Sequence, residues 1–340
     1  MSASVAVVVP FFQKERGILA RSLASVFAQE LPAETRMRVM VVDDASPVPL
    51  AHELANITVP EHIELTALKR ENGGPGAARN TGLDALDPAQ TEFVAFLDSD
   101  DTWASNHIAD ALHALRTADA DFYFCDHTRF DIEGTWFGER RAFANWGGPG
   151  HPDFSALPGS DAAVSIAAAD LFPAMLDEYL SQTSTVVYRY ARHPALRFDV
   201  TLRNAGEDHL FWLELVKAGE RSVISFAPNV HCGRGVNVYY DALDWASPKV
   251  TSRYGYLVMF RLKIMQSFAL DAETRTAVSR QLDVHTRAYS YLFVRQLAKG
   301  TMPDLKLASK LFAMSPARMA AMPMHFARGL RTRKSEAHLW

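Results

Sequence analysis

An acidic turn directly follows an apolar run near the middle of the chain. The run 93–97 reads as a buried strand, and the turn 98–101 that follows is Asp-Ser-Asp-Asp. Its carboxylates therefore emerge where a strand reaches solvent, close enough to share one hard cation. Mg²⁺ and Mn²⁺ prefer such oxygen ligands and are commonly completed by substrate phosphates and water. The turn predicts a metal site with Asp98 and Asp100 as ligands; capping of the next helix is the structural alternative.

A glycine-rich segment follows the third apolar run. Asn72-Gly73-Gly74-Pro75-Gly76 leads straight into a helix that starts near Ala77. Backbone amides at a helix N-terminus favour bound phosphate, and Arg79 adds a positive charge for a diphosphate. The alternatives are a tight turn that needs flexible residues and a surface ion pair for Arg79. The segment is neither a Walker P-loop nor a G-x-G-x-x-G fingerprint.

Polar or aromatic residues also follow the first two strands. Pro10-Phe11-Phe12 ends the run 5–9, and Asp43 and Asp44 follow the run 39–42. In open α/β sheets, ligands bind outside the carboxyl ends of the strands, where an acidic residue recognises a ribose in dinucleotide folds. Asp43 and Asp44 are therefore candidates for base or ribose recognition, with a simple Asp-Ala-Ser-Pro turn as the alternative. Four strand ends are expected to converge on one crevice.

Two further candidates lie in the second half of the chain. Glu207 and Asp208 occupy the expected first turn of a helix over 207–217. The helix dipole favours carboxylates there, but a transfer to a hydroxyl also needs a general base, which one of them can supply. The segment 231–237 is expected to be a polar, flexible loop that closes on phosphates. His231 within it is a candidate third metal ligand, although a lone histidine is more often structural.

The order of the elements predicts an α/β fold with a mostly parallel central sheet flanked by helices. Near-continuous apolar runs, typical of strands buried on both faces, alternate with helical stripes up to about residue 125. A long loop over the site is expected for 127–160, then a helix over 161–180 and a short strand over 184–188. From about residue 250 onward the chain is expected to be helical.

Composition narrows the class of protein. The 340 residues carry a formal net charge of -4, which argues against a general nucleic-acid binder. Cys125 and Cys232 form neither a C-x-x-C pair nor a disulfide framework, no secretory signal is visible, and no apolar stretch approaches the roughly 20 residues that span a bilayer. A cytoplasmic protein, soluble or peripheral at the membrane, is expected.

The end of the chain is basic. After residue 298, eight lysines and arginines are opposed only by Asp304 and Glu336, with several methionines and leucines between them. A basic, partly amphipathic helix suits the anionic inner face of the cell membrane. The alternatives are a packed helix with a solvated basic face, or a frayed terminus.

Taken together, these motifs closely resemble those of family 2 glycosyltransferases of the GT-A fold. The resemblance covers roughly residues 5–240 and implies an inverting enzyme that uses a nucleoside diphosphate sugar, often UDP-linked, with Mn²⁺ or Mg²⁺. It assigns the metal to Asp100 and the general base to Asp208. It implies that Pro10, Phe12 and Asp44 hold the nucleotide. With the residues at the strand ends, the candidate donor-binding residues are Pro10, Phe11, Phe12, Glu15, Asp43, Asp44, Gly73, Gly74, Arg79, Asp98 and Ser99. Many members carry Tyr-Asn where this chain has Phe12-Gln13, which leaves ring stacking on the base as the contact.

Three short segments further resemble bacterial exopolysaccharide enzymes of the succinoglycan glucosyltransferase type. They are 11–15 (Phe-Phe-Gln-Lys-Glu), 72–76 (Asn-Gly-Gly-Pro-Gly) and 232–237 (Cys-Gly-Arg-Gly-Val-Asn). This resemblance implies UDP-glucose as donor, a β bond, and a polyprenyl-diphosphate-linked oligosaccharide acceptor. We expect three regions in the chain: a donor-binding half over 1–126, an acceptor-binding and catalytic half of the same GT-A domain over 127–248, and a helical C-terminal region over 249–340 with the basic tail. One alternative is a sugar-1-phosphate nucleotidyltransferase, but this chain lacks the Gly-rich loop that such an enzyme is expected to carry after strand one. The other is a non-catalytic nucleotide-sugar binder, against which the possible base at Glu207-Asp208 argues. A dehydrogenase is disfavoured because the glycines follow strand three.

Overall fold

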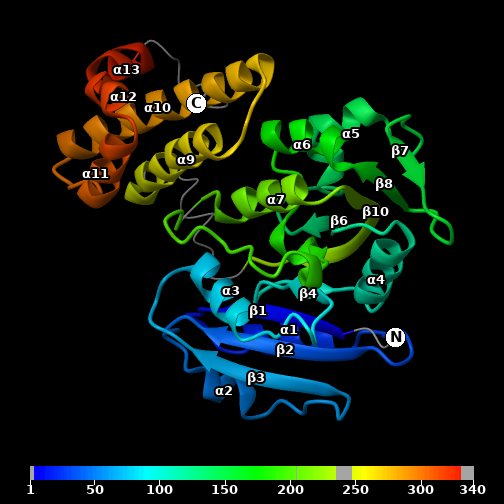
Figure 1. Ribbon diagram of the computed structural model, residues 1–340. Coiled ribbons are helices and arrows are strands. Elements are labelled where there is room, and N and C mark those ends of the chain that lie inside the picture. Colours follow the sequence, from blue (N-terminus) through cyan, green and yellow to red (C-terminus); the bar gives the residue numbers. More distant parts are fainter. Residues whose placement is uncertain (1–3, 204, 235–246, 331–340) are drawn as a thin grey trace. The chain divides into compact units, whose positions relative to one another are not determined.

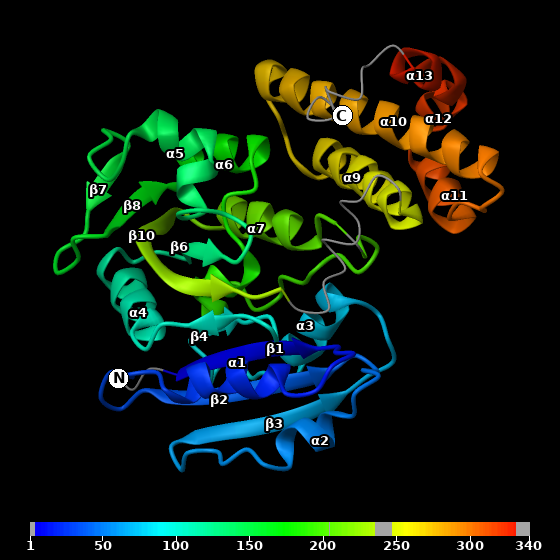
Figure 2. The ribbon, with the colours of Figure 1, turned by 180° about the vertical axis from the view of Figure 1, so that it is seen from behind.

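The computed structural model describes residues 4–203, 205–234 and 247–330. The chain forms two compact units, shown in Figure 1 and from behind in Figure 2. The α/β unit comprises Met1–Val200 and Phe211–Val236, and the helical unit comprises Thr201–Leu210 and Asn237–Trp340. The predicted division at residues 126 and 248 stays a prediction.

The first part of the α/β unit is a parallel sheet in the order β3-β2-β1-β4. Its strands are β1 (Ser4–Phe11), β2 (Arg36–Asp43), β3 (Ile63–Lys69) and β4 (Phe93–Phe96). β1 pairs in parallel with both β2 and β4, so the carboxyl ends of these strands lie at the same edge. This is the arrangement that the alternating apolar runs predicted.

Helices cover both faces of this parallel sheet. They are α1 (Ile18–Phe27), α2 (Leu50–Leu54), α3 (Pro75–Asp84) and α4 (His107–Thr117). The apolar stripes of α1 and α4 share one buried cluster with Val7 and Val9 of β1. The other face of β1 meets α3 so closely that a Cβ added at Gly82 would lie 2.5 Å from Val8 Cγ1. Successive strand residues point to opposite faces, so β1 supplies both layers of the core.

The sheet continues beyond β4 with mixed polarity. Its remaining strands are β5 (Thr102–Trp103), β6 (Phe122–Arg129), β7 (Phe154–Ala156), β8 (Ala163–Ala167), β9 (Val187–Tyr188) and β10 (Arg221–Cys232). β9 pairs antiparallel with both β4 and β6, β10 runs parallel to β6, and α4 packs on β6 and β10 (Figure 2). The predicted α/β fold with a helix-flanked central sheet is confirmed.

The segment 127–180 differs from the prediction. The expected long loop over 127–160 contains the end of β6, a 3₁₀ turn at Phe137–Glu139, α5 (Arg141–Trp146) and β7. Aromatic packing holds it, with Phe137 and Phe143 stacked at a centroid distance of 3.7 Å. The expected helix over 161–180 begins as β8, which pairs with β10, and only α6 (Ala168–Asp177) is helical. The expected strand over 184–188 is a 3₁₀ turn, Thr183–Thr185, followed by β9.

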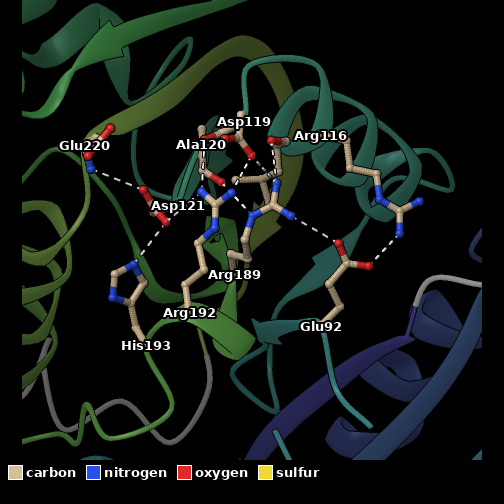
Figure 3. A network of polar contacts seen from close by, with 10 residues as sticks. Glu92, Arg116, Asp119, Ala120, Asp121, Arg189, Arg192, His193 and Glu220 are labelled. Atoms are coloured by element: carbon tan, nitrogen blue, oxygen red, sulfur yellow. Dashed lines mark hydrogen bonds and ion pairs between the residues drawn. The ribbon is translucent and has the colours of Figure 1, made fainter. Parts of the chain in front are cut away.

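A network of ion pairs fixes β9 between its two neighbours (Figure 3). Arg189 directly follows β9, donates hydrogen bonds to the backbone oxygens of Ala120 and Leu115, and pairs with Glu92 at 3.1 Å. Beside it, Asp121 accepts hydrogen bonds from His193 and from the backbone N–H of Glu220. Burial alone raises the pKa of Asp121, but these bonds and one from Arg192 outweigh it and lower that pKa. The network therefore ties the end of β9 to the segments next to β4 and β6.

The helical unit is built around two long helices. α9 (Pro248–Ser267) and α10 (Ala272–Ala298) pack together, and α11 (Leu305–Met314) packs on α9. Two short helices follow, α12 (Pro316–Ala320) and α13 (Met322–Gly329), with α13 against α10. Gly255 of α9 permits a close approach, since a Cβ there would lie 2.6 Å from Leu307. None of the helices within 4–203, 205–234 and 247–330 is both long and apolar enough to cross a membrane.

Candidate active site

Asp44 holds the glycine-rich turn against the end of β2. The Asp44 carboxylate is 4% exposed and accepts hydrogen bonds from the backbone N–H groups of Gly73, at 2.9 Å, and Gly74, at 2.8 Å. It also pairs with Arg70 Nη1 at 2.7 Å. Gly74 adopts φ 91°, a conformation that favours glycine, and α3 begins at Pro75. Three predicted donor-binding residues are thus brought together at the start of a helix.

The residues after β1 take different places. Phe11 is fully buried in the hydrophobic core, so its ring packs there and does not line the strand-end site, contrary to the prediction. Pro10 and Phe12 are partly exposed at the strand end, and Glu15 is exposed in the following bend. Asp43 Oδ1 accepts a hydrogen bond from the backbone N–H of Ser46 at 2.8 Å. The Asp43 carboxylate therefore caps the turn, which is the structural role weighed for it above.

Gln13 joins three strand ends. Its side chain, 2% exposed, donates through Nε2 to Ser99 Oγ at 2.9 Å, and its backbone N–H donates to Ser46 Oγ at 2.9 Å. Gln13 Oε1 is buried and has no hydrogen-bond partner among the described residues. Ser99 is thereby fixed by a residue that follows β1, so the acidic turn after β4 is tied to the neighbouring strand.

The acidic turn 98–101 is anchored on two sides. Asp98 Oδ1 pairs with Arg79 Nη2 at 2.6 Å, and Arg79 is only 3% exposed, with its guanidinium over the ring of Phe198. Asp101 is 3% exposed and accepts hydrogen bonds from Ser184 Oγ at 2.6 Å and from Gln182 Nε2 at 3.0 Å. Asp98 and Asp101 are therefore held by α3 and by the turn before β9.

The carboxylates of this turn repel one another. Burial, and then the neighbouring charge of Asp98, raise the pKa of Asp100 to about 6. Burial, and then the charges of Asp100 and Asp98, raise the pKa of Asp101. Burial, and then the charges of Asp101, Asp98 and Asp100, also raise the pKa of the Cys232 thiol. Three carboxylates are thus crowded beside Arg79 and Arg21, and a hard divalent cation would relieve their repulsion. The donor set of Asp98 and Asp100 fits such a cation.

His231 lies on a strand and not in a loop. The end of β10 pairs with β5 on one side, where His231 stands opposite Thr102, and with β6 on the other, up to Cys232 opposite Arg129. His231 Nδ1 is 2.9 Å from Thr128 Oγ1 on β6. In the described part of the chain no three His, Cys, Asp or Glu side chains form a group that could hold a metal ion. Asp98, Asp100 and His231 are therefore not a preformed three-residue cluster, and 235–237 of the predicted loop lies outside the described residues.

Glu207 and Asp208 begin α7 (Glu207–Ala218), as predicted. Both carboxylates stand in the first turn, and Asp208 Oδ1 accepts a hydrogen bond from the backbone N–H of His209 at 2.7 Å. Glu207 is 8% exposed, whereas Asp208 is partly exposed. Gly206 precedes them with φ 88°, and a Cβ there would lie 2.8 Å from the ring of Phe260. These residues belong to the helical unit, and the role of Asp208 as base stays a prediction.

Comparison with known proteins identifies the family. Residues 6–177 match the model of "Glycosyl transferase family 2". The succinoglycan biosynthesis protein ExoW of Rhizobium meliloti is 37% identical over 248 residues, which are 73% of this chain and 74% of that protein. This chain is a family 2 glycosyltransferase. A second relative, the succinoglycan biosynthesis protein ExoO of the same organism, is 25% identical over 92% of this chain and 82% of that protein.

Solved structures agree on the fold of this glycosyltransferase. S. aureus TarS 1-349 in complex with UDP-GlcNAc superposes with a TM-score of 0.59 at 17% identity, covering 99% of this chain and 92% of that one. The mannosyltransferase PcManGT from Pyrobaculum calidifontis, in complex with GDP-Man and Mn²⁺, gives a TM-score of 0.54 at 17% identity, covering 97% and 88%. At such identities the likeness concerns the fold alone, which is GT-A.

Four residues that the structure brings to the candidate site were not among those predicted. Arg70 and Gln13 lie close to strand ends, where the position after an apolar run was a usable signal. Gln182 and Ser184 come from the turn before β9, and Gln182 Nε2 also lies 3.4 Å from Asp98 Oδ2. No local pattern marks this turn as part of the site, because only the antiparallel return of β9 between β4 and β6 brings it there.

Proposed function

We propose that this glycosyltransferase moves glucose from UDP-glucose to a lipid-linked oligosaccharide during exopolysaccharide synthesis, with inversion at the anomeric carbon. The observation that carries the proposal is the junction of the acidic turn with the glycine-rich helix start, through the 2.6 Å pair of Arg79 and Asp98. The similarity to ExoW and ExoO, both named as succinoglycan biosynthesis proteins, supports the substrate class. A lipid-linked acceptor places the reaction at the cytoplasmic face of the membrane.

The chain's own residues supply the parts of a single displacement. The start of α3 attracts the donor diphosphate, because the N-terminal end of a helix favours negative charge. Asp44 holds this helix start in place through the N–H groups of Gly73 and Gly74. Phe12 at the end of β1 offers a partly exposed ring for stacking on the base. When held by Asp98 and Asp100, Mn²⁺ or Mg²⁺ supplies positive charge beside the diphosphate. These features together position the donor and stabilise its leaving group.

Asp208 acts as the general base in this mechanism. Its carboxylate accepts the proton of the acceptor hydroxyl as that oxygen forms a bond to the anomeric carbon. The bond between the anomeric carbon and the diphosphate oxygen breaks on the opposite side, and its electron pair leaves with UDP. One displacement therefore inverts the anomeric centre and gives a β-linked product from an α-linked donor.

The test is transfer of radiolabelled sugar to a lipid-linked saccharide acceptor, with UDP-glucose, UDP-galactose, UDP-GlcNAc and GDP-mannose as donors. We expect UDP-glucose to give the fastest transfer and the product to show a β anomeric coupling by NMR. Asp208→Asn should lower kcat by on the order of 10²–10⁴-fold, with UDP affinity unchanged, whereas Glu207→Gln serves as the neighbouring control. Retained turnover in Asp208→Asn contradicts the base assignment. Donor binding without transfer to any acceptor favours a non-catalytic binder.

A further inference from the structure

We propose that an exposed corner of the helical unit docks on the surface of an anionic lipid bilayer. This corner, called the basic corner below, lies where α10 passes into α11. Its members are all exposed: Lys299, Met302, Leu305, Lys306, Lys310 and Phe312. The inference is independent of the proposed function, since it concerns a surface of the helical unit and none of the candidate active-site residues.

Positive charge is concentrated in the helical part of the chain. Residues 247–330 contain thirteen lysines and arginines but only four aspartates and glutamates, although the whole chain has a formal net charge of -4. One of the four acids, Asp304, accepts a hydrogen bond from the backbone N–H of Leu307 at 3.0 Å and caps α11. An asymmetry of charge between parts of a chain is typical of binding to an anionic surface.

α11 presents a second apolar stripe that is more than half exposed. Leu307 and Leu311 are 2% and 0% exposed and form the inner face, which packs on α9. Leu305 and Phe312 stand seven residues apart on the opposite face and are 55% and 54% exposed. The inner stripe holds α11 on α9, whereas the outer stripe faces solvent.

Two lysines flank this outer stripe. Lys306 and Lys310 are one helical turn apart and exposed, and neither has an ion-pair partner among residues 4–203, 205–234 and 247–330. Met302 in the preceding connector is 70% exposed. The connector is folded back on α10, because Gln296 Nε2 donates to the backbone oxygen of Met302 at 3.3 Å. Apolar and cationic side chains are thus held on one ordered surface.

The exposed lysines and apolar side chains of the basic corner fit an anionic bilayer better than they fit a nucleic acid or an acidic protein. At an anionic membrane the lysines meet phosphate headgroups while Leu305 and Phe312 enter the headgroup–acyl boundary. A nucleic acid or an acidic protein surface would use the lysines but gain little from the exposed apolar side chains. The basic tail expected from the sequence includes 331–340, which lies outside the described residues, so the basic corner stands on its own contacts.

The experiment is co-sedimentation of the full chain with vesicles of phosphatidylcholine containing 30% phosphatidylglycerol, and with phosphatidylcholine alone. We expect binding to the anionic vesicles that weakens with salt. The double variant Lys306→Gln/Lys310→Gln should bind roughly 25-fold more weakly, since each lysine near an anionic surface contributes about fivefold. Phe312→Ser should weaken binding about tenfold, at low and high salt alike.

Matched controls distinguish binding through the basic corner from binding through the overall positive charge of the helical unit. Arg275→Gln/Arg280→Gln makes the same charge change at exposed positions of α10, and Val200→Ser removes a valine that is 53% exposed in the α/β unit. Both should stay within twofold of the unmodified chain. The proposal is overturned by absent binding, by an equal loss in the arginine control, or by a loss with the lysine variant but not with Phe312→Ser. It is also overturned if truncation after residue 330 abolishes binding while the corner variants retain it.

Discussion

Arg79 is a buried cation whose removal gives the sharpest test of how the acidic turn is held. Its Nη2 pairs with Asp98 Oδ1 at 2.6 Å, and its guanidinium lies 5.3 Å from the centroid of the Phe198 ring. The side chains of Arg79 and Asp98 are 4% and 27% exposed. Arg79→Met keeps much of the volume but leaves Asp98 without its partner, next to Asp100. The variant therefore adds an uncompensated charge to a turn whose carboxylates already repel one another.

The expected cost follows from the burial of the pair. Removing one partner of a buried ion pair costs about 3–5 kcal/mol of unfolding free energy. Because Asp98 is partly exposed, water screens its charge in the variant, and we expect a value near 3 kcal/mol. Replacing Asp98 by Asn in the same chain removes the stranded charge. The double variant Arg79→Met/Asp98→Asn should therefore lose at least about 1 kcal/mol less than the sum of the two single variants.

The assay is urea unfolding followed by tryptophan fluorescence. Trp103, Trp136, Trp146 and Trp212 all belong to the α/β unit, so the signal reports mainly on the unit that contains the turn. Arg21→Met is the matched control, since the exposed Arg21 side chain donates to the backbone oxygen of Asp100 at 3.0 Å and should contribute below about 1 kcal/mol. A cost for Arg79→Met equal to that of the control, or strictly additive single effects, would refute this reasoning.

Three further predictions concern buried and crowded positions. Burial lowers the pKa of His107 from 6.5 to about 3. The neutral ring therefore stabilises the fold fully above pH 6.5, and this contribution is lost as the pH falls from there toward 3. Between pH 7 and pH 5 the unfolding free energy of His107→Gln should fall about 2 kcal/mol less than that of the unmodified chain, and an equal fall would contradict this. Gly233→Ala places a Cβ 2.2 Å from the backbone oxygen of Asp100; we expect weaker UDP binding by calorimetry, and unchanged binding would mean that the two segments separate at no cost. Gly206→Ala combines φ 88° with a Cβ 2.8 Å from Phe260; it should lower the unfolding free energy by about 1–3 kcal/mol in urea, and a loss below 0.5 kcal/mol would show that the Phe260 ring moves aside freely.

Much of the donor half was predictable from the sequence because its signals are local. Val5 to Val9 is apolar on both faces, as a central parallel strand must be, and a polar group directly after such a strand has to lie at the sheet edge. The strand ends and the first turn of α7 at Glu207 were therefore placed correctly, and the helix expected to start near Ala77 begins two residues earlier, at Pro75. Phe11 was misplaced because it belongs to the buried face of β1, which alternation along the strand decides.

The rest depends on contacts between distant segments. Ser184 reaches the acidic turn only because β9 returns antiparallel between β4 and β6. His231 is in a strand because the end of β10 pairs with both β5 and β6, and no property of the segment 231–237 itself indicates this. Likewise, β8 read as the start of a helix because a short apolar segment fits both periodicities. Pairing with β10 decides in favour of a strand.

The most direct test of the central claim, that the ends of β1, β2 and β4 bind a nucleotide-sugar donor, is calorimetric titration with UDP, GDP and dTDP, each with and without Mn²⁺. We predict UDP-selective binding that strengthens with Mn²⁺ and loses that strengthening in Asp100→Ala. Unchanged metal-dependent binding in Asp100→Ala would contradict the assignment of that carboxylate. No binding of any nucleotide, with or without metal, would contradict the donor site as a whole.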